Sequence, residues 1–319
     1  MSKLLTALET AEWLKERDSF LLITHRRPDG DTLGSAGALT QALREYGKTV
    51  YVLFNKEITP RYSKYIDDCI APDDFIPDNV ITVDIASVDL FPDNAKSYAN
   101  NISLCIDHHG SNTMFASNTC LNQERASCGE VIYDILTEIL DYTISPVVAE
   151  RLYVALSTDT GCFMFGNTTS NTLRVASLLV DAGAPIKTLN KELFRTKARS
   201  CIKLEGLLNT GLEFYFDGKV AISSITKAMI ETTKATEDDM DNIAALPGAV
   251  EGVYIGITIR EMTSPEDCKI SVRASAPYDA NEICSKFGGG GHKTAAGATV
   301  QKTVSKIKED LLKVLEDMF

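Results

Sequence analysis

The sequence of 319 residues is longer than a single modest hydrophobic core requires, so its length favours two domains. Apolar residues make up 44% and charged residues 24%, and the formal charge of −12 disfavours a protein that coats long nucleic acid. The sequence shows neither a signal peptide nor a run of roughly 18 apolar residues, so we expect no membrane span and a cytoplasmic location.

The eight cysteines occur singly, without a CxxC pair or a Cys-His cluster. We interpret them as small buried hydrophobic residues in a reducing compartment, not as a zinc site. The acidic charge is compatible with a small phosphate substrate, because bound cations supply positive charge locally.

Short strands and helices alternate in the first half of the chain. A helix is predicted over 32–47. Apolar runs predict strands at 20–24, 48–54, 80–84 and 102–107. Near-continuous apolar strands separated by helices favour an α/β domain with a mainly parallel sheet and helices on both faces.

Two further helices follow the last of these strands. Apolar residues at helical spacing predict a helix over 127–140, and Ser127 and Glu130 fit a capping box at its start. Ser145-Pro146 predicts the first turn of the next helix.

The pattern changes in the second half. Two apolar runs around Asp217-Gly218 predict a hairpin, and alternating strands and amphipathic helices follow. We therefore predict a smaller α+β domain after a polar helical connector, with the active site in the cleft between the domains. The predicted limits are 1–186 for the catalytic domain, 187–209 for the helical linker and 210–319 for the substrate-binding domain.

Histidine occurs at only four positions, which are His25, His108, His109 and His292. Each lies in a turn-like segment dense with Asp or Gly, beside an apolar strand or helix. A single histidine is more often a surface or satisfied core residue than a ligand. The joint placement of the four nevertheless favours a functional site.

The segment THRRPDGD places His25, Asp29 and Asp31 within seven residues, between a strand and a helix. Pro28 and Gly30 force a tight bend, so these side chains can converge. A solvated turn with a helix cap would explain one aspartate, but not both together with the histidine. Calcium binding is disfavoured because the EF-hand spacing is absent.

Acidic and imidazole side chains also follow the next two strands. Asp84 ends one predicted strand, and Asp107, His108 and His109 lie at the end of the other. Because the carboxyl ends of parallel strands share one edge of a sheet, we expect these residues to meet His25 there. Each aspartate alone is more often a cap or turn residue, so the prediction depends on the whole set.

Asp159, in ALSTDTG, is a further acidic candidate. With it, six side chains are enough to hold two ions that share one bridging carboxylate. Mixed carboxylate and imidazole ligands suit Mn²⁺ or another first-row ion better than an all-oxygen magnesium site or a thiolate-rich zinc site. Two ions ~3.5–4 Å apart can activate a water and hold both the attacking and the leaving oxygen of a phosphate ester.

At this point the chain resembles the DHH phosphoesterase family, specifically the bacterial nanoRNase and pAp-phosphatase type. The resemblance covers essentially the whole sequence. Its motifs here are ITHRRPDGDTLGS, VDIAS, IDHHGSN, LSTDTGCF and, in the DHH-associated second domain, FGGGGHKTAAG. Each motif alone is weak, but together they are specific.

The resemblance implies two Mn²⁺ ions, although other divalent cations are compatible. It implies that His109 contacts the scissile phosphate and that Asp107 orients the neighbouring histidine, beside the bridging Asp84. The ligands of one ion would be His25, Asp29 and Asp84, and those of the other would be Asp31, Asp84, His108 and Asp159. Every ligand position matches the family pattern, which implies an active enzyme.

The glycine run of the second domain is interpreted as a substrate-binding segment. Gly288, Gly289, Gly290 and Gly291 would let backbone amides approach an anion, beside a short helix expected to begin near His292. A flexible linker is the alternative, although the run lies between a helix and a strand. Arg273 is a candidate phosphate or base contact, or a solvated arginine on a strand.

The leading hypothesis is a manganese-dependent hydrolase that degrades short oligoribonucleotides from 3′ to 5′ and converts pAp (adenosine 3′,5′-bisphosphate) to AMP. An acidic chain fits substrates such as nanoRNA, pAp or pApA, and neither long nucleic acid nor a membrane is an expected partner. A homodimer is left open. Hydrolysis of cyclic di-AMP or pApA by the same machinery is the alternative.

Two readings rank lower. A manganese inorganic pyrophosphatase would carry a Ser-Arg-Lys-Lys-Gln segment, which is absent here. A nucleotide-binding sensor without turnover is disfavoured by the intact set of ligand positions.

Overall fold

A computed structural model of the chain describes residues 2–139, 142–240 and 243–319. It separates into two compact units, Met1–Thr196 and Lys197–Phe319. Residue 140, which the sequence pattern places in the helix over 127–140, lies outside the described residues. None of the helices in the described ranges is long and apolar enough to cross a membrane.

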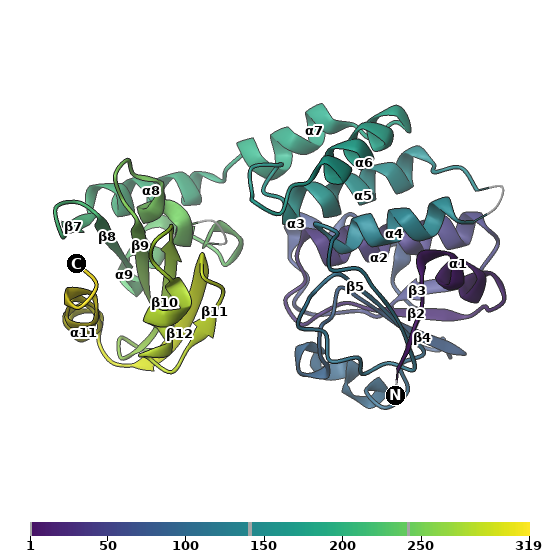
Figure 1. Cartoon of the computed structure of the whole chain (residues 1–319), viewed down its shortest axis with the longest axis horizontal. Coiled ribbons are helices and arrows are strands. Elements are labelled where there is room, and N and C mark those ends of the chain that lie inside the picture. The colour runs from purple at the N-terminus through teal and green to yellow at the C-terminus, as the bar shows by residue number, and fades with distance from the viewer. Residues whose placement is uncertain (1, 140–141, 241–242) are drawn as a thin grey trace. The chain divides into compact units, whose positions relative to one another are not determined.

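The first unit is built on a six-stranded sheet in which every neighbouring pair of strands is parallel (Figure 1). All four residues of the FLLI strand are buried, as expected for a strand covered on both faces. The strands in sheet order are β1 (Lys3–Leu4), β6 (Asn118–Leu121), β5 (Leu104–Asp107), β4 (Asn79–Val83), β2 (Phe20–Ile23) and β3 (Val50–Val52). The predicted parallel α/β architecture is confirmed.

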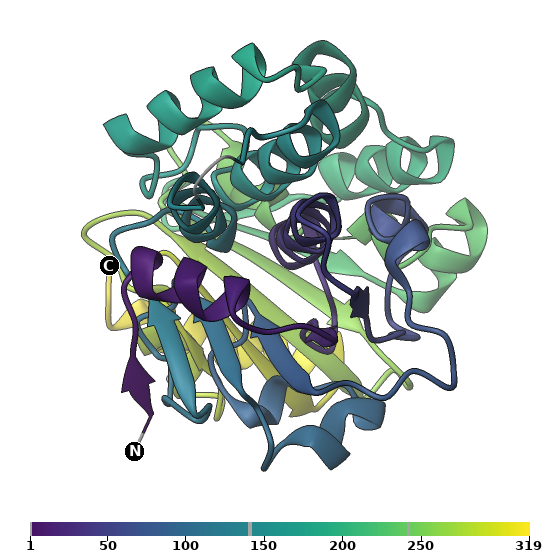
Figure 2. The same ribbon diagram turned by 90° about the vertical axis from the view of Figure 1, so that its right-hand side faces the viewer.

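Helices cover this sheet unequally, with the α-helices above the strands in Figures 1 and 2 and the short 3₁₀ helices of residues 88–98 on the other side. The α-helices are α1 (Ala7–Lys15), α2 (Gly30–Glu45), α3 (Pro60–Ser63), α4 (Cys128–Thr137), α5 (Pro146–Asp159), α6 (Ser170–Asp181) and α7 (Ile186–Asn190). The 3₁₀ helices are η1 (Asp67–Cys69), η2 (Val88–Leu90) and η3 (Asp93–Tyr98), and η4 (Lys191–Arg195) is a π-helix.

Two apolar cores stabilise the sheet from its two faces. Leu22 of β2 packs in the larger core with Leu33 of α2. Its neighbour Ile23 packs in a smaller core with Phe91, which follows η2. Adjacent residues of a strand point to opposite faces, so one short apolar strand contributes to both cores.

The helix starts show where local sequence signals act. Helix α2 begins at Gly30, two residues before the predicted start, because the Asp29 side chain caps it by accepting from two backbone amides. The capping box predicted for α4 is only half formed. Ser127 accepts from the amide of Glu130, but the buried Glu130 carboxylate accepts from Asn171 of α6 instead of returning to residue 127.

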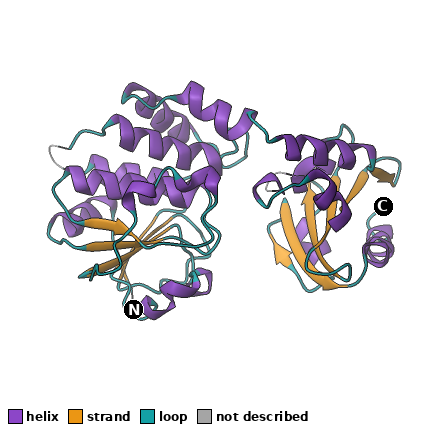
Figure 3. Ribbon diagram, turned by 180° about the vertical axis from the view of Figure 1, so that it is seen from behind, coloured by secondary structure: helices purple, strands orange, loops and turns teal. Residues whose placement is uncertain are grey.

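The second unit contains a mixed sheet between helices (Figure 3). Its strands in sheet order are β11 (Gly290–Gly291), β12 (Ala295–Gln301), β10 (Asp267–Ala274), β9 (Ile255–Glu261), β8 (Val220–Ile225) and β7 (Glu213–Tyr215). Its helices are α8 (Arg199–Thr210), α9 (Lys227–Thr233), η5 (Asp238–Met240), η6 (Ile243–Ala249), α10 (Ala280–Ser285) and α11 (Val304–Glu316). The predicted α+β organisation and the β7–β8 hairpin around Asp217-Gly218 are confirmed.

The short helix predicted near His292 is wrong. Residues 290–297 form a tight antiparallel hairpin in which the amide of His292 donates to the carbonyl of Ala295. The run of glycines permits this because β11 lies very close to β12. A Cβ on Gly289 would lie 2.2 Å from the carbonyl oxygen of Gly297. Close packing of two strands, not a helix N-terminus, therefore accounts for Gly289 and Gly291.

Candidate active site

Three adjacent strands of the first sheet end at one edge, and a histidine or aspartate follows each of them. His25 lies two residues after β2, Asp84 directly after β4, and His108 directly after β5. Asp84 has a left-handed backbone with φ of 60°, a conformation that Asp tolerates better than most residues. This turn bends the chain at the end of β4.

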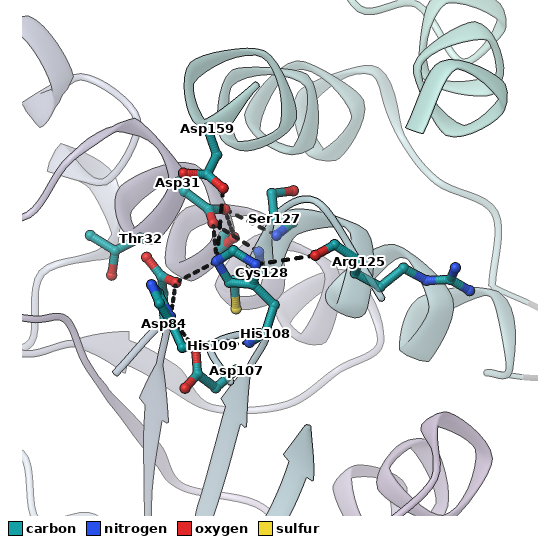
Figure 4. Close-up of polar contacts among 12 residues, drawn as sticks. Asp31, Thr32, Asp84, Asp107, His108, His109, Arg125, Ser127, Cys128 and Asp159 are labelled. Carbon is teal, nitrogen blue, oxygen red and sulfur yellow. Dashed lines mark hydrogen bonds and ion pairs between the residues drawn. The ribbon is translucent and has the colours of Figure 1, made fainter. Parts of the chain in front are cut away.

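Two helix ends bring further carboxylates to the same place (Figure 4). Asp31 lies in the first turn of α2, and Asp159 is the last residue of α5. The Asp31 carboxylate accepts from the amides of Cys128 and Gly129 at 2.8 and 3.0 Å. These amides begin α4, so the positive end of that helix holds the buried charge.

The structure brings all six predicted ligand residues together. The Nε2 atom of His108 lies 3.6, 3.5 and 3.8 Å from carboxylate oxygens of Asp31, Asp84 and Asp159. The candidate ligand atoms of the first group lie within 4.8 Å of one another, as do those of the second. The two groups are His25, Asp29 and Asp84, and Asp31, His108 and Asp159.

His108 is held in the orientation that a metal ligand needs. Its Nδ1 atom donates to the carbonyl of Arg125 at 3.2 Å, which leaves Nε2 facing the carboxylates (Figure 4). Burial, followed by the neighbouring charge of His109, lowers the pKa of His108, so the ring is neutral at neutral pH. A neutral imidazole with its free nitrogen towards carboxylates fits a cation between them.

His109 differs from His108 in both environment and charge. Its Nδ1 atom donates to the buried Asp107 carboxylate at 2.8 Å, and this hydrogen bond raises the pKa of His109. The His109 side chain is 45% exposed, whereas Asp107 is fully buried. The pair therefore favours the protonated form of a ring at the open side of the cluster. Of the two histidine rings, the structure places the His109 ring against Asp107.

Asn112 is a functional residue that the sequence reasoning did not single out. Its Nδ2 atom donates to Asp107 at 2.6 Å and to the carbonyl of Ile85 at 3.3 Å. Asp107 thus accepts from an amide side chain as well as from His109. The signal was available, because Asn112 ends the quoted motif IDHHGSN. The spacing alone does not show that its side chain turns back towards Asp107. Ser35, whose hydroxyl donates to Asp31 at 3.1 Å, was missed for the same reason.

The cluster carries more negative charge than its protein partners compensate. Burial, and then repulsion from neighbouring aspartates, raises the pKa of Asp31 and of Asp84 well above the usual range. Burial and the charge of Asp29 raise the pKa of Asp159 to about 6. Among the described residues, the buried Oδ1 atom of Asp84 has no hydrogen-bond partner. This oxygen lies between the rings of His108 and His109. Carboxylate oxygens together with imidazole nitrogens form a donor set that suits a first-row divalent cation.

The predicted substrate-binding residues all lie in the second unit. Arg273 of β10 pairs in register with Ala295, directly after the turn that contains His292. Its guanidinium is half-buried, and no carboxylate of the described residues forms an ion pair with it. His292 is exposed. The structure thus places Arg273 beside the glycine hairpin, on one sheet.

The glycine amides do not form the free anion cradle that the sequence suggested. Gly288 and Gly289 donate to carbonyls of α10 residues, and Gly291 donates to the Asn281 side chain at 2.9 Å. Their hydrogen-bonding capacity is therefore used inside the unit. The groups of this hairpin that remain for a ligand are side chains, above all that of His292.

Comparison with known proteins matches both units to family models. The model of the DHH family, N-terminal domain, matches residues 19–156, and that of the DHHA1 domain matches residues 217–319. The chain is 29% identical to the bifunctional oligoribonuclease and PAP phosphatase NrnA of Thermus thermophilus, over 91% of this chain and 87% of that protein. It is 26% identical to the protein of the same name from Bacillus subtilis, over 89% of this chain and 90% of that protein.

Among solved structures, the chain superimposes on an exopolyphosphatase-related protein from Bacteroides fragilis with a TM-score of 0.82. The two share 23% identity, and the match covers 98% of this chain and 97% of the other. At this identity the likeness establishes the fold alone.

Proposed function

Because this chain belongs to the DHH family of phosphoesterases, we propose that it hydrolyses short oligoribonucleotides and removes the 3′-phosphate of pAp. The observation that carries the proposal is the cluster of six acidic and imidazole side chains at one edge of the parallel sheet. Curated relatives that match nearly the whole chain are named for these two activities, which supports the same substrates. We propose the 3′→5′ direction for the oligonucleotide reaction.

The residues fit two divalent cations, and we propose Mn²⁺. His25, Asp29 and Asp84 would hold one ion, and Asp31, Asp84, His108 and Asp159 the other. When bound, the cations supply Lewis-acid activation of the attacking water and neutralise the phosphoryl oxygens. Asp84 lies in the first group and in a further group with His108 and His109, and its orphaned oxygen supports a bridging role.

His109 is proposed to bind the scissile phosphate. The Nδ1–H group donates to Asp107, which favours the charged ring, and in that form Nε2 also carries a proton that can be donated to a phosphate oxygen. The raised pKa of His109 favours the charged ring, whose hydrogen bond to a phosphate is the stronger one. Asp107 in turn is fixed by Asn112, so the ring cannot rotate away without breaking its part-buried hydrogen bond to Asp107.

Arg273, Gly288 to Gly291 and His292 are proposed to bind the nucleotide part of the substrate. The half-buried guanidinium of Arg273 offers a fork of donors to a phosphate or a base edge. His292 offers an exposed ring on a rigid hairpin. The glycines contribute by allowing the close strand pairing that fixes this ring.

Turnover of four compounds with Mn²⁺ tests the proposal: pAp, pApA, cyclic di-AMP and an RNA trimer labelled at its 5′ end. We expect release of phosphate from pAp, and shortening of the trimer through a labelled dinucleotide if the direction is 3′→5′. Immediate release of a labelled mononucleotide would reverse the direction. Preference for cyclic di-AMP or pApA would favour the alternative substrate. Turnover of none of the four would leave a nucleotide-binding protein without hydrolysis.

A further inference from the structure

The loop at residues 160–169, between α5 and α6, carries two exposed apolar side chains directly after the candidate ligand Asp159. Met164 is 78% exposed and Phe165 is 57% exposed. Isolated exposed apolar residues are ordinary on protein surfaces. Two in succession, beside a cluster of buried charges, require a different explanation.

This loop is held rigidly in a strained conformation. Gly161, Cys162 and Phe163 are consecutive left-handed residues, with φ of 55°, 56° and 67°. Non-glycine residues adopt this conformation at a cost, and such strain concentrates at functional sites. The amides of residues 161, 162, 163 and 165 all donate within the loop or to the end of α5. The Asn167 side chain also ties the loop to the carbonyl of Asp159 at 3.1 Å.

The loop fixes one face of the Phe165 ring and leaves the rest open. Its Cζ, Cε1 and Cε2 atoms lie 2.4, 2.5 and 2.7 Å from the position that a Cβ on Gly161 would take. Such similar distances place the ring face-on over the glycine. Phe163, by contrast, turns inward and packs near Tyr153 at a ring distance of 6.0 Å. The alternation anchors the loop on Phe163 and holds Phe165 outward.

Resting on the proposed function, we propose that Phe165 is a specificity-determining residue that stacks on the base of the nucleotide whose phosphate is hydrolysed. Gly161 lies two residues after Asp159, so its Cα is at most about 7.6 Å from that of the candidate ligand. An aromatic face this close to the site matches the stacking platforms of proteins that bind single-stranded nucleic acid. Stacking accepts every base and is absent for phosphate esters that carry no base. The residue therefore selects nucleotides over other phosphate esters.

The test compares pAp with ribose 3′,5′-bisphosphate, which keeps both phosphates and lacks the base. Wild type should hydrolyse pAp with a KM about tenfold lower than that of the baseless compound, within the range that stacking of one base supplies. Phe165→Ala should raise the KM for pAp about tenfold and leave that of the baseless compound unchanged. Phe165→Trp should retain the preference for pAp. Equal loss on both compounds would mean that Phe165 only supports Asp159, and the inference would fail.

A binding measurement separates this inference from the proposed hydrolysis. In a nucleoside 3′,5′-bisphosphate carrying 2-aminopurine, fluorescence should be quenched by wild type and much less by Phe165→Ala. Ile76→Ala is the matched control, because Ile76 is 84% exposed and precedes β4, at the opposite edge of the sheet. It should change neither measurement. If wild type quenches the base but hydrolyses neither bisphosphate, the proposed function fails and stacking stands. Unaltered quenching in Phe165→Ala would overturn stacking alone.

Discussion

The two sheet edges that carry the family motifs differ in whether their polar groups have hydrogen-bond partners within the protein. At the edge of the first sheet, the buried Asp84 keeps an oxygen without a hydrogen-bond partner among the described residues, amid other carboxylates. In the glycine hairpin of the second sheet, the amides of Gly288, Gly289 and Gly291 are all used internally. One edge is electrostatically incomplete and the other is complete.

This difference indicates which groups of each unit a bound ligand would stabilise. Uncompensated buried charge is costly, so the first edge gains strongly from cations. The hairpin has no such deficit, and its ligands must be bound by side chains such as those of His292 and Arg273. We therefore expect metal chemistry to depend on a few atoms of the first unit, and substrate affinity to depend on weaker contacts in the second.

The sharpest test of the incomplete edge is Asp84→Asn, which keeps the shape and the left-handed backbone but removes the charge. We expect hydrolysis to fall by more than the 10²-fold that loss of an outer partner of a metal ligand costs, because both of the proposed ions would lose a ligand. The measurement is kcat with saturating Mn²⁺. Asp89→Asn, which removes an exposed carboxylate five residues away, is the control and should be silent. Near wild-type turnover of Asp84→Asn would contradict the bridging role.

Stability against pH tests whether the charge at this edge is uncompensated. Since burial and Asp29 raise the pKa of Asp159 to about 6, the folded chain binds this proton more tightly than the unfolded chain. Stability of the metal-free protein should therefore fall as pH rises from about 4 through 6. Added Mn²⁺ at 100 times its Kd should restore about 2.7 kcal/mol at pH 7.5.

Asp159→Asn is the matched variant for this pH experiment, measured by thermal unfolding with EDTA or Mn²⁺. It should be more stable than wild type at pH 7.5 without metal, and equal to it near pH 4. Stabilisation by Mn²⁺ should be weaker in the variant. A metal-free wild type that gains stability over the same pH window, relative to the variant, would rule out an uncompensated carboxylate.

A smaller effect is expected at Asn112, which belongs to the first edge but already has its hydrogen-bond partners. Asn112→Ala leaves one oxygen of the buried Asp107 without its amide partner and loosens His109. We expect kcat to fall by 10- to 100-fold, with a smaller change in metal affinity. Asn118→Ala removes a comparable hydrogen bond to the carbonyl of Ser103 and should leave kcat intact. Equal losses in both variants would point to general destabilisation.

The smallest effect on catalysis is expected from the glycine hairpin of the second unit. His292→Ala removes an exposed side chain without breaking the hairpin, since the bonds of residue 292 within it are made by its backbone. We expect KM for short oligonucleotides to rise several-fold, the value of one or two lost hydrogen bonds, with Mn²⁺ affinity unchanged. Thr299→Ala, which removes an exposed side chain of β12, is the control. An unaltered KM in His292→Ala would remove the hairpin from the substrate-binding surface.

Sequence patterns were strongest where a local rule sets the structure. The apolar run at 20–24 predicted β2, and Ser145-Pro146 predicted the start of α5, because strand burial and helix capping are decided by neighbouring residues. The parallel order of the strands followed from the alternation with helices. With that order, the meeting of His25, Asp84 and His108 at one edge could be expected before any coordinates.

Local signals failed where a distant segment competes for the same group. Glu130 has the spacing of a capping box, but its carboxylate is drawn to Asn171 on another helix. The glycines before His292 have the composition of an anion-binding loop, but the amides of Gly288 and Gly289 donate to carbonyls at the end of α10 and that of Gly291 donates to the Asn281 side chain. Asn171 lies 41 residues after Glu130, so spacing carries no information about this partner, and composition does not show that the preceding helix uses the glycine amides.

The sequence by itself determined the elements, the parallel sheet and the residue types gathered at its edge, since these follow from periodicity and from the geometry of parallel strands. Only the tertiary structure decided which atoms face one another. It directed the His108 Nε2 atom towards the carboxylates, because the Nδ1–H group donates a hydrogen bond to the carbonyl of Arg125. It also set Phe165 over Gly161 through three left-handed residues. Such orientations depend on contacts between separate segments, and those contacts exist only once the chain has folded.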